Sequence, residues 1–442
     1  MNYDVIVIGA GLAGLMAAEA AQEKGSRVLI LAKGMGSLPL TSGCIDALGY
    51  FPESSAAPVS SPLETLGELK RVNPSHPYSR LGKESILSAL ARFQDLTLSN
   101  GLPYAGGFDA SVLIPTALGT YHPTCLVPET MKNGVLSLPG RVLLLGFEGL
   151  KDFSACLASE NLNLWRARGK IAPSFRAETL TRVKLEGKAL NSLNLARAFD
   201  GEEFREQVAR QVQPLLKSGE KLGLPAVLGY SSSQSAWADL QKRLGTDIFE
   251  VPLPPPSIPG LRLYNLMRAG LQEKGVRVII GLSALKPILE KGEIQGIALG
   301  EARKSPVYRA SAYVLATGKF VGGGLDAQRN RIFETLFDLP VEYPQNRKEW
   351  FTKQLLTSIG QPFNSFGVEV NENLQPADSG GKVIYQNLYA AGGILAHADS
   401  MAEKSGGGVA IATGYVAGQF AAACARKGFT TEGTEVEGNQ KT

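Results

Sequence analysis

Residues that build metal sites and disulfides are scarce in this sequence. The three histidines, His76, His122 and His397, are far apart, and none belongs to a zinc motif of the HExxH kind. The four cysteines form no CxxC pair, so we expect neither a disulfide framework nor a bound metal. No signal peptide precedes Asp4, and a reducing cytoplasm is the expected compartment.

Grouped charge is also missing. The formal net charge is +4 over 442 residues, and the basic residues are interspersed rather than gathered in a stripe, which argues against nucleic-acid binding. One segment, Ser405 to Ala425, has no charged side chain. It is rich in Gly and Ala and interrupted by Thr413, Tyr415 and Gln419, so we predict a tightly packed core helix and no direct membrane span.

The sequence does contain a clear phosphate-binding unit at its start. An apolar run from Asp4 to Ile8 predicts a buried parallel strand, residues 15–24 a helix, and residues 27–31 a second strand. Between the first strand and the helix stands a GxGxxG loop, formed by Gly9, Gly11 and Gly14. In such a βαβ unit the glycines allow a tight turn, close approach of a phosphate and close helix packing. The helix N-terminus then offers N–H groups and a positive dipole end to an anion, so Leu12 and Ala13 also belong to the predicted site.

One element of a dinucleotide site is absent. The second strand of such a fold usually ends in Asp or Glu, which holds the adenosine ribose. Here it ends in Leu31-Ala32-Lys33. Either the adenosine half is held differently, or the ligand is a mononucleotide, or Lys33 meets a 2′-phosphate; Lys33 as a plain surface lysine is a fourth interpretation.

The length of the chain and its proline-rich run predict two domains. Residues 76–257 are expected to form an inserted cap or substrate domain, and the proline-rich run 251–260 marks the return of the chain. Residues 1–75 and 258–430 are expected to form a Rossmann-like FAD/NAD(P)-binding domain with a parallel sheet, helices and a β-meander. The predicted fold class is therefore α/β with an inserted α+β cap, followed by a disordered tail from 431 to 442.

Two later segments favour a flavin. The tripeptide Ala316-Thr317-Gly318 follows a predicted strand, as in two-dinucleotide-domain flavoproteins, where such a turn passes beside the cofactor. The pair Gly392-Gly393 and the triplet from Gly406 to Gly408, which opens the uncharged helix, resemble a C-terminal flavin clamp of the same superfamily. A helix N-terminus at the pyrimidine edge of the flavin stabilises negative charge on the reduced ring.

Together these segments resemble the family of the B subunit of anaerobic glycerol-3-phosphate dehydrogenase. Four stretches carry the resemblance, and it extends over nearly the whole chain except the tail: residues 32–46, 195–200, 254–262 and 316–324. In the family, too, the segment that corresponds to residues 32–46 lacks the acidic residue that usually ends the second strand. The resemblance implies a flavin, usually FMN, with FAD as the alternative.

The resemblance also implies a respiratory function. The family protein pairs with an FAD-bearing A subunit and docks on a membrane-anchored iron–sulfur C subunit, so a cytoplasmic location peripheral to the inner membrane is implied. The complex oxidises sn-glycerol 3-phosphate to dihydroxyacetone phosphate and passes electrons to quinone, with fumarate or nitrate as terminal acceptor. The expected cofactor-binding residues combine the segments above: Gly9, Gly11, Leu12, Ala13, Gly14, Lys33, Ser42, Gly43, Thr317, Gly318, Gly392, Gly393, Gly407 and Gly408.

Alcohol oxidation by a flavin requires a base for the hydroxyl proton, and a phosphorylated substrate requires cationic donors. His397, which follows the C-terminal glycine pair, is the first candidate acid or base and His122 the second, with Arg262 as a candidate anion binder. Three alternatives remain at this stage: an electron-relay protein whose partner performs the alcohol chemistry, a flavin-binding scaffold without turnover, and a nicotinamide-dependent dehydrogenase.

Overall fold

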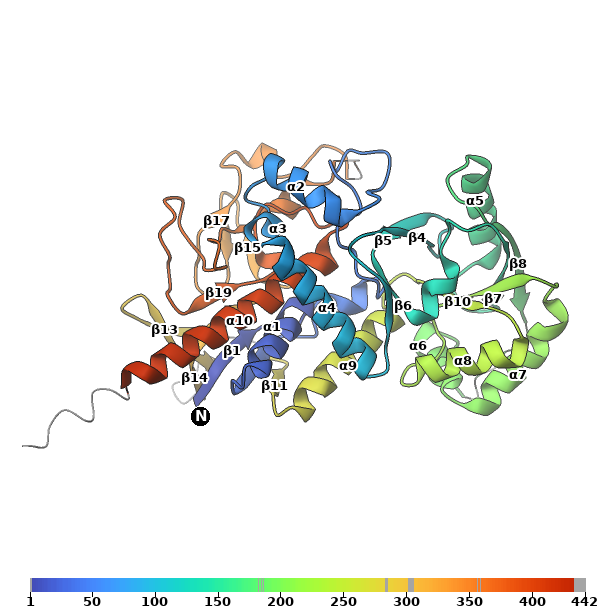
Figure 1. Cartoon of the computed structure of the whole chain (residues 1–442), viewed down its shortest axis with the longest axis horizontal. Helices are drawn as coiled ribbons and strands as arrows, with labels where there is room; N and C mark the ends of the chain where they lie inside the picture. Colours follow the sequence, from blue (N-terminus) through green and yellow to red (C-terminus); the bar gives the residue numbers. More distant parts are fainter. Residues whose placement is uncertain are drawn as a thin grey trace, which may run out of the picture.

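The computed structural model describes residues 2–432 except 182, 184, 186, 283–284, 301–305, 356 and 358, and side chains only as far as residue 426. Two domains lie side by side in Figure 1, each with its own apolar core. We call them the Rossmann-like domain and the inserted domain. Of the predicted disordered tail, residues 433–442 lie outside the described residues, and residues 431–432 form the end of a helix.

The Rossmann-like domain is built on a sheet whose central strands are parallel. Hydrogen-bonded neighbours follow the order β11-β2-β1-β14, and β19 pairs with the second half of β14. These strands are apolar, and β1, β2 and β14 are largely buried, as expected where both faces of a parallel sheet are covered. Their bounds are β1 Asn2–Ile8, β2 Val28–Ala32, β11 Arg277–Ile280, β14 Val307–Leu315 and β19 Leu388–Ala390. The antiparallel strands β12 (Leu285–Glu290) and β13 (Glu293–Leu299) extend the sheet beyond the first half of β14.

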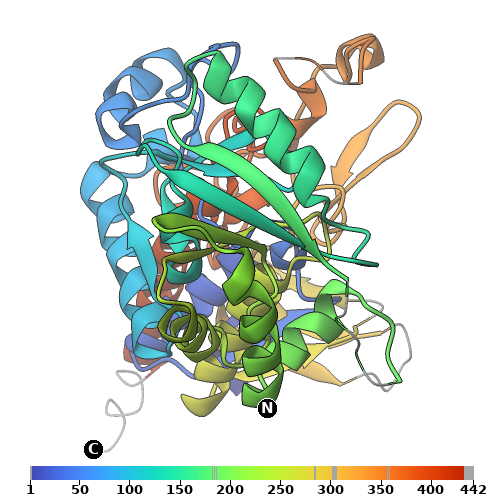
Figure 2. The same ribbon diagram turned by 90° about the vertical axis from the view of Figure 1, so that its right-hand side faces the viewer.

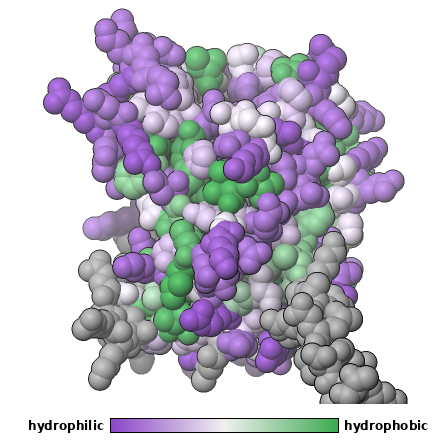
Figure 3. Space-filling model, turned by 90° about the vertical axis from the view of Figure 1, so that its left-hand side faces the viewer, coloured by the Kyte–Doolittle hydropathy of each residue, from purple (hydrophilic) through white to green (hydrophobic). Residues whose placement is uncertain are grey.

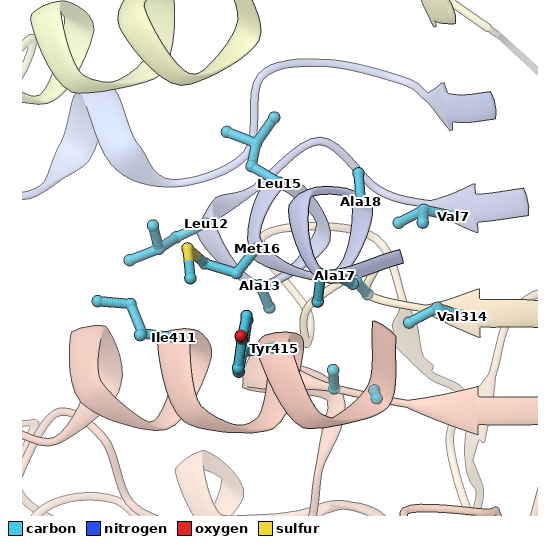
Figure 4. Packing of buried hydrophobic residues seen from close by; sticks show 14 of the residues in the cluster. Val7, Leu12, Ala13, Leu15, Met16, Ala17, Ala18, Val314, Ile411 and Tyr415 are labelled. Atoms are coloured by element: carbon cyan, nitrogen blue, oxygen red, sulfur yellow. The ribbon is translucent and has the colours of Figure 1, made fainter. Parts of the chain in front are cut away.

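Helix α1 (Leu12–Glu23) packs closely against the long helix α10 (Gly406–Glu432) on one face of this sheet (Figure 4). A Cβ atom on Gly414 would lie 2.3 Å from the carbonyl oxygen of Ala13, and one on Gly418 would lie 2.2 Å from that of Ala17. The two helix backbones therefore meet at positions where only glycine fits, which explains the Gly and Ala content of the uncharged segment.

Helix α10 passes a length-and-composition test for a membrane span over Gly406–Arg426, yet 67% of its most apolar window is buried inside the protein. Val409, Ile411, Ala412 and Ala417 all belong to the core. On the face of the molecule away from the inserted domain, apolar side chains are intermingled with polar ones (Figure 3). The interpretation as a core helix therefore agrees with the packing.

The inserted domain contains a second parallel sheet, with strand order β10-β9-β7-β8. Helices cover it (Figure 2), so this part is α/β, whereas we expected α+β. Two antiparallel ribbons adjoin it: β3 (Tyr104–Gly106) pairs with β6 (Leu126–Pro128), and β4 (Val112–Pro115) pairs with β5 (Tyr121–Thr124). The bounds are β7 Arg141–Phe147, α5 Ala155–Ala167, β8 Ser174–Leu180, α6 Ser192–Phe199, α7 Glu202–Val212, β9 Glu220–Pro225, α8 Ser233–Leu244 and β10 Ile248–Val251.

The inserted domain begins later than the expected residue 76. Helix α4 (Lys83–Ser99) places Ile86, Phe93 and Leu96 in the core of the Rossmann-like domain, whereas the core of the inserted domain begins at Ala117. Amphipathic spacing predicts the helix but not which sheet its apolar face meets. The remaining elements from residue 62 to residue 134 are α2 Pro62–Val72, α3 Pro77–Arg80, β3 Tyr104–Gly106, β4 Val112–Pro115, β5 Tyr121–Thr124, β6 Leu126–Pro128 and the 3₁₀ helix η2 Glu129–Gly134.

The chain returns to the Rossmann-like domain at α9 (Ile258–Glu273), beside the predicted proline-rich junction. The hydroxyl oxygen of Ser257 caps this helix by accepting the N–H of Gly260 at 3.0 Å. Short elements complete the fold: η1 Leu38–Leu40, η3 Gln213–Leu215, β15 Leu325–Ala327, β16 Ile332–Glu334, β17 Val341–Glu342, η4 Arg347–Glu349, η5 Pro362–Ser365, β18 Gly367–Val368 and η6 Gly392–Ile394.

Candidate functional site

The predicted cofactor segments meet at the carboxyl edge of the central sheet. Strands β1, β14 and β19 are parallel and in register, with Ile8 beside Leu315 and Leu315 beside Ala390. The glycine loop, the Ala316–Gly318 turn and the Gly392-Gly393 pair directly follow these strand ends. In open α/β sheets this edge is where ligands bind.

Gly9 and Gly14 are required by the protein itself. Gly9 has a positive φ of 118°, and a Cβ on it would lie 2.2 Å from the carbonyl oxygen of Ala316. A Cβ on Gly14 would lie 2.0 Å from the carbonyl oxygen of Gly9. The loop, the first turn of α1 and the β14 turn are thus packed backbone against backbone.

Gly11 is different, because no protein atom lies closer than 3.8 Å to the position of its missing Cβ. It is the N-cap of α1, with extended backbone and no side-chain cap. The N–H groups of Leu12 and Ala13 have no acceptor among the described residues. A bare helix N-terminus beside an unfilled Cβ position fits the phosphate of a nucleotide or flavin.

The β14 turn contributes an unpaired polar atom to the same edge. Oγ1 of Thr317 is buried and has no hydrogen-bond partner among the described residues. Next to it, Cα of Gly318 lies 3.7 Å from the Cβ position of Gly393, and the Cβ position of Gly392 lies 2.5 Å from Cβ of Ala13. The structure therefore brings the three predicted glycine segments together, and the orphaned hydroxyl is available to a ligand.

The N-terminus of α10 packs on the segment after η1. The N–H of Gly408 donates to the carbonyl of Asp46 at 2.8 Å, and a Cβ on Gly407 would lie 3.1 Å from N of Asp46. Nε2 of His122, on β5, lies 2.9 Å from Oδ1 of Asp46, and both side chains are about one-fifth exposed, 20% and 23%. His122 therefore reaches the predicted clamp from the inserted side, through an aspartate fixed by α10.

The remaining predicted cofactor residues surround this edge. Oγ of Ser42 accepts the N–H of Cys44 at 3.2 Å, and the carbonyl of Gly43 accepts the hydroxyl of Tyr104 at 2.7 Å. Nζ of Lys33, beyond the end of β2, lies 3.5 Å from the Cβ position of Gly323. A cation thus stands where a dinucleotide fold usually places its ribose carboxylate.

His397 is committed to another network. Its Nε2 is hydrogen-bonded to Oε2 of Glu369, and Oε1 of Glu369 accepts Nη2 of Arg80 at 2.7 Å. Burial raises the pKa of the Glu369 carboxyl, but the hydrogen bond and charge of His397, helped by Arg80, outweigh it, so the pKa lies below its ordinary value. His397 itself has a positive φ of 68°. The ring is therefore held in an ion-pair chain.

Arg262, the predicted anion binder, is paired with a buried carboxylate of the protein. Its Nη1 and Nη2 donate to the two oxygens of Glu250 at 2.7 and 2.9 Å, and its Nε donates to the carbonyl of Gly229 at 2.7 Å. Glu250 also accepts from Thr130 and from the N–H of Leu228. Arg262 is 5% exposed, so its position is that of a buried tie between α9 and the inserted domain.

Two charged residues of this region carried no role in the sequence analysis. Asp46 ends the first of the four family-like stretches, but only the fold pairs it with His122. Lys319 follows Gly318 in the last of those stretches, and its Nζ donates to the carbonyl of Ala398 at 3.1 Å. Their positions within family-like stretches are the sequence signal that could have marked both residues as candidates.

Comparison with known proteins agrees with this geometry. A model of the FAD binding domain family matches residues 4–409. The chain is therefore a flavoprotein of the FAD-binding-domain class.

The relatives narrow that class. A probable B subunit of anaerobic glycerol-3-phosphate dehydrogenase from Halobacterium salinarum is 34% identical over 96% of this chain and 98% of its own. The corresponding B subunit of Pectobacterium carotovorum is 32% identical over 93% and 96%. The chain belongs to the family of anaerobic glycerol-3-phosphate dehydrogenase B subunits. Among solved structures, a 3-ketosteroid dehydrogenase from Rhodococcus jostii is similar at 13% identity and a TM-score of 0.41, over 96% of each chain.

Proposed function

We propose that this chain oxidises sn-glycerol 3-phosphate to dihydroxyacetone phosphate with a flavin bound at the carboxyl edge of the central sheet. The observation that carries the proposal is the convergence there of the α1 N-terminus, the orphaned Thr317 hydroxyl and the N-terminus of α10. A bound flavin supplies hydride acceptance at its N5 atom. Family membership supplies the substrate class.

We propose FMN as the cofactor, with FAD as the alternative. The N–H groups at the start of α1 and the Gly11 backbone would hold its phosphate, and the ammonium of Lys33 would face a second negative charge. A phosphate monoester carries more charge than one phosphate of a diester, so a lysine at the end of β2 favours a terminal phosphate over a ribose. Thr317, Gly318, Gly392 and Gly393 would border the remainder of the molecule.

His122 is the proposed general base, ahead of His397. Its ring is oriented by the carboxylate of Asp46, which both fixes the ring and stabilises its protonated form after the substrate hydroxyl gives up a proton. The backbone of Asp46 is held by Gly408 at the start of α10. His397 lacks such an attachment to the clamp, because its ring is bound to Glu369. Since Arg262 is saturated by Glu250, we propose no substrate contact for it.

The proposal includes the partners that the family implies. An FAD-bearing A subunit and a membrane-anchored iron–sulfur C subunit would receive the electrons and pass them to quinone, with fumarate or nitrate as terminal acceptor. The chain would then be peripheral to the inner membrane on the cytoplasmic side, held there by its partners.

Cofactor release tests the first part of this proposal. The purified chain is denatured, and the released flavin is separated by chromatography against FMN and FAD standards. Release of FMN in near-equimolar amount would support the proposal. Release of FAD would show that the alternative cofactor is the correct one, and a protein free of flavin would refute the proposed site. The Gly11→Ala variant is the matched control, because its Cβ would project into the proposed phosphate position.

A further inference from the structure

Lys319 is a cation that the chemistry proposed above does not use. It directly follows the Ala316–Gly318 turn, and its ammonium donates to the backbone carbonyls of Asn364 and Ala398, the latter at 3.1 Å. Both acceptors are neutral. No ion pair of Lys319 occurs among the described residues, although its ammonium lies in surroundings that desolvate it. One of its three protons has no assigned acceptor.

Two carboxylates face the Lys319 ammonium, and both are engaged with other groups. Oδ1 of Asp399 accepts the N–H groups of Met401 and Ala402, each at 3.0 Å, and Oδ2 lies 3.3 Å from Nδ2 of Asn364. Among the described residues, Asp399 and Glu403 are the charged groups that act on the Lys319 ammonium. Asp399 therefore attracts the ammonium from a distance without neutralising it.

The second carboxylate, Glu403, is a fixed anion. It accepts Nε2 of His76 at 3.2 Å, Oγ of Ser405 at 2.7 Å and the N–H of Asp399 at 3.1 Å. Burial raises the pKa of the Glu403 carboxyl, but these hydrogen bonds and the charge of His76 outweigh it and hold the pKa below its ordinary value. Its charge thus remains in place across the neutral range, and its hydrogen bonds are already made.

The place of Lys319 in the fold points to a ligand. Its backbone continues the turn that contains the orphaned Thr317 hydroxyl, and its ammonium lies against Ala398, a few residues before α10 begins. The cation thus lies between the β14 turn and the segment that leads to α10, and the β14 turn borders the proposed flavin site. Lys319 is partly exposed and its two acceptors are neutral, so its charge is available to stabilise a negative charge that develops nearby.

We propose that the Lys319 ammonium stabilises the negative charge of the reduced flavin, adding a side-chain cation to the dipole of α10. The proposal rests on the proposed function. Asn364 and Ala398 fix the ammonium in place, so that no reorganisation is needed when the charge develops. The field of Lys319 is also adjustable: burial lowers its pKa to about 8, against the attraction of Asp399 and Glu403. It is therefore protonated at neutral pH and loses its charge at moderately alkaline pH.

A merely structural role is the competing explanation, since the same two hydrogen bonds tie η5 to the segment before α10. Sulfite separates the two roles without substrate turnover. Its electron pair forms a bond to N5 of an oxidised flavin, and the displaced ring electron pair leaves negative charge near N1 and O2. A nearby cation strengthens this adduct, whereas a brace that only holds the fold does not. The adduct is followed as loss of the visible flavin absorption.

The experiment compares the flavin-loaded wild-type chain with Lys319→Met and Lys319→Arg. We expect the sulfite dissociation constant to rise at least tenfold in Lys319→Met and less than threefold in Lys319→Arg, with thermal unfolding of both recorded alongside. Above about pH 8 the sulfite affinity of the wild type should fall more than that of Lys319→Met. In Lys319→Met the ionisation of sulfite itself is the remaining source of pH dependence. An unchanged dissociation constant in a flavin-loaded Lys319→Met would overturn the proposal.

A second variant keeps the test decisive if Lys319→Met does not retain flavin. Asp399→Asn removes a charge that attracts the ammonium but keeps an oxygen for the N–H groups of Met401 and Ala402. The alkaline loss of sulfite affinity should then move to lower pH, and an unmoved profile would contradict the role of Lys319. A wild-type chain that binds no flavin would instead refute the proposed function as a whole, so the two failures are distinguishable.

Discussion

Oδ1 of Asp46 lies 2.9 Å from Nε2 of His122, and the backbone carbonyl of the same aspartate accepts the N–H of Gly408 at the start of α10. One residue thereby joins a histidine of β5 to the helix terminus that borders the proposed flavin site. The connection crosses from the β4–β5 ribbon, which packs against the core of the inserted domain, to the C-terminal helix. If His122 is the proposed base, this connection fixes its position relative to the start of α10.

The first prediction concerns this dyad. His122→Gln should lower kcat for glycerol 3-phosphate about 100-fold or more, the scale of general acid–base catalysis. Asp46→Asn should cause a smaller loss, because the ring remains but is no longer held as a base. Flavin content should stay at the wild-type level in both variants. Steady-state kinetics of the assembled dehydrogenase and the visible spectrum of each variant provide the measurements.

The matched control is the other histidine–carboxylate pair. His397→Gln and Glu369→Gln break a hydrogen bond of the same kind outside the clamp, and should change kcat less than tenfold. If instead His397→Gln abolished turnover while His122→Gln kept it, His397 would be the base.

A second prediction separates two glycines of one loop. Gly14→Ala places a Cβ 2.0 Å from the carbonyl of Gly9, so the flavin-free protein should lose about 1–3 kcal/mol of unfolding free energy. In Gly11→Ala the added Cβ would lie 3.8 Å from Cα of Gly36, an ordinary van der Waals distance. The flavin-free protein should therefore keep its unfolding free energy but bind flavin at least tenfold more weakly. Chemical denaturation and flavin titration of the two apoproteins distinguish these effects; equal flavin affinity for Gly11→Ala and wild type would place the phosphate elsewhere.

A third prediction follows from the buried tie between Arg262 and Glu250. Arg262→Leu leaves the Glu250 carboxylate buried without its bidentate partner, which should cost about 3–5 kcal/mol of unfolding free energy. The Michaelis constant for glycerol 3-phosphate should remain within about threefold in the protein that stays folded, because all three donor nitrogens already bind protein atoms. A stable Arg262→Leu protein with a greatly raised Michaelis constant would restore Arg262 as the anion binder.

A fourth prediction concerns pH and the pair Arg176–Glu220 in the inserted domain, joined at 2.7 Å. The hydrogen bond from Arg176 outweighs burial and lowers the pKa of Glu220 below its ordinary 4.5. A carboxyl with a depressed folded-state pKa stabilises the protein above its unfolded pKa and loses that contribution as pH falls through the folded value. Glu220→Gln should therefore destabilise the chain by about 1–3 kcal/mol near neutral pH.

The pH series itself is the measurement for Glu220. The difference between wild type and Glu220→Gln should shrink steadily as pH falls below about 4.5. A difference that is constant down to strongly acidic pH would mean that packing, not ionisation, accounts for the effect.

Local patterns carried most of the fold. The GxGxxG unit predicted β1, α1 and β2, because buried parallel strands and a helix bounded by glycines have short-range signals. Helical sequence after Ser192 is instead divided into α6 and α7 at Asp200, whose carboxylate accepts N–H groups of Ser231 and Ser232 from a distant loop. Such a tertiary hydrogen bond leaves no periodic trace in the sequence.

Those parts of the site in which the backbone conformation requires glycine were predictable from the sequence. Gly9 and Gly14 are fixed by contacts within a few residues of one loop and by the neighbouring strand. Side-chain pairings were not predictable: Asp46 with His122, and Arg262 with Glu250, join elements whose approach depends on the packing of both domains. This is why Arg262, a cation in a family-like stretch, suggested an anion site and is instead saturated by protein.

The most direct measurement of the central claim is an anaerobic titration of the flavin-loaded chain with glycerol 3-phosphate, followed by visible absorption. If this chain performs the oxidation, its flavin bleaches on addition of substrate even without partner proteins, and the His122→Gln variant bleaches far more slowly. A flavin that stays oxidised in the presence of substrate, yet is reduced by dithionite, would contradict the claim and leave the chain an electron relay.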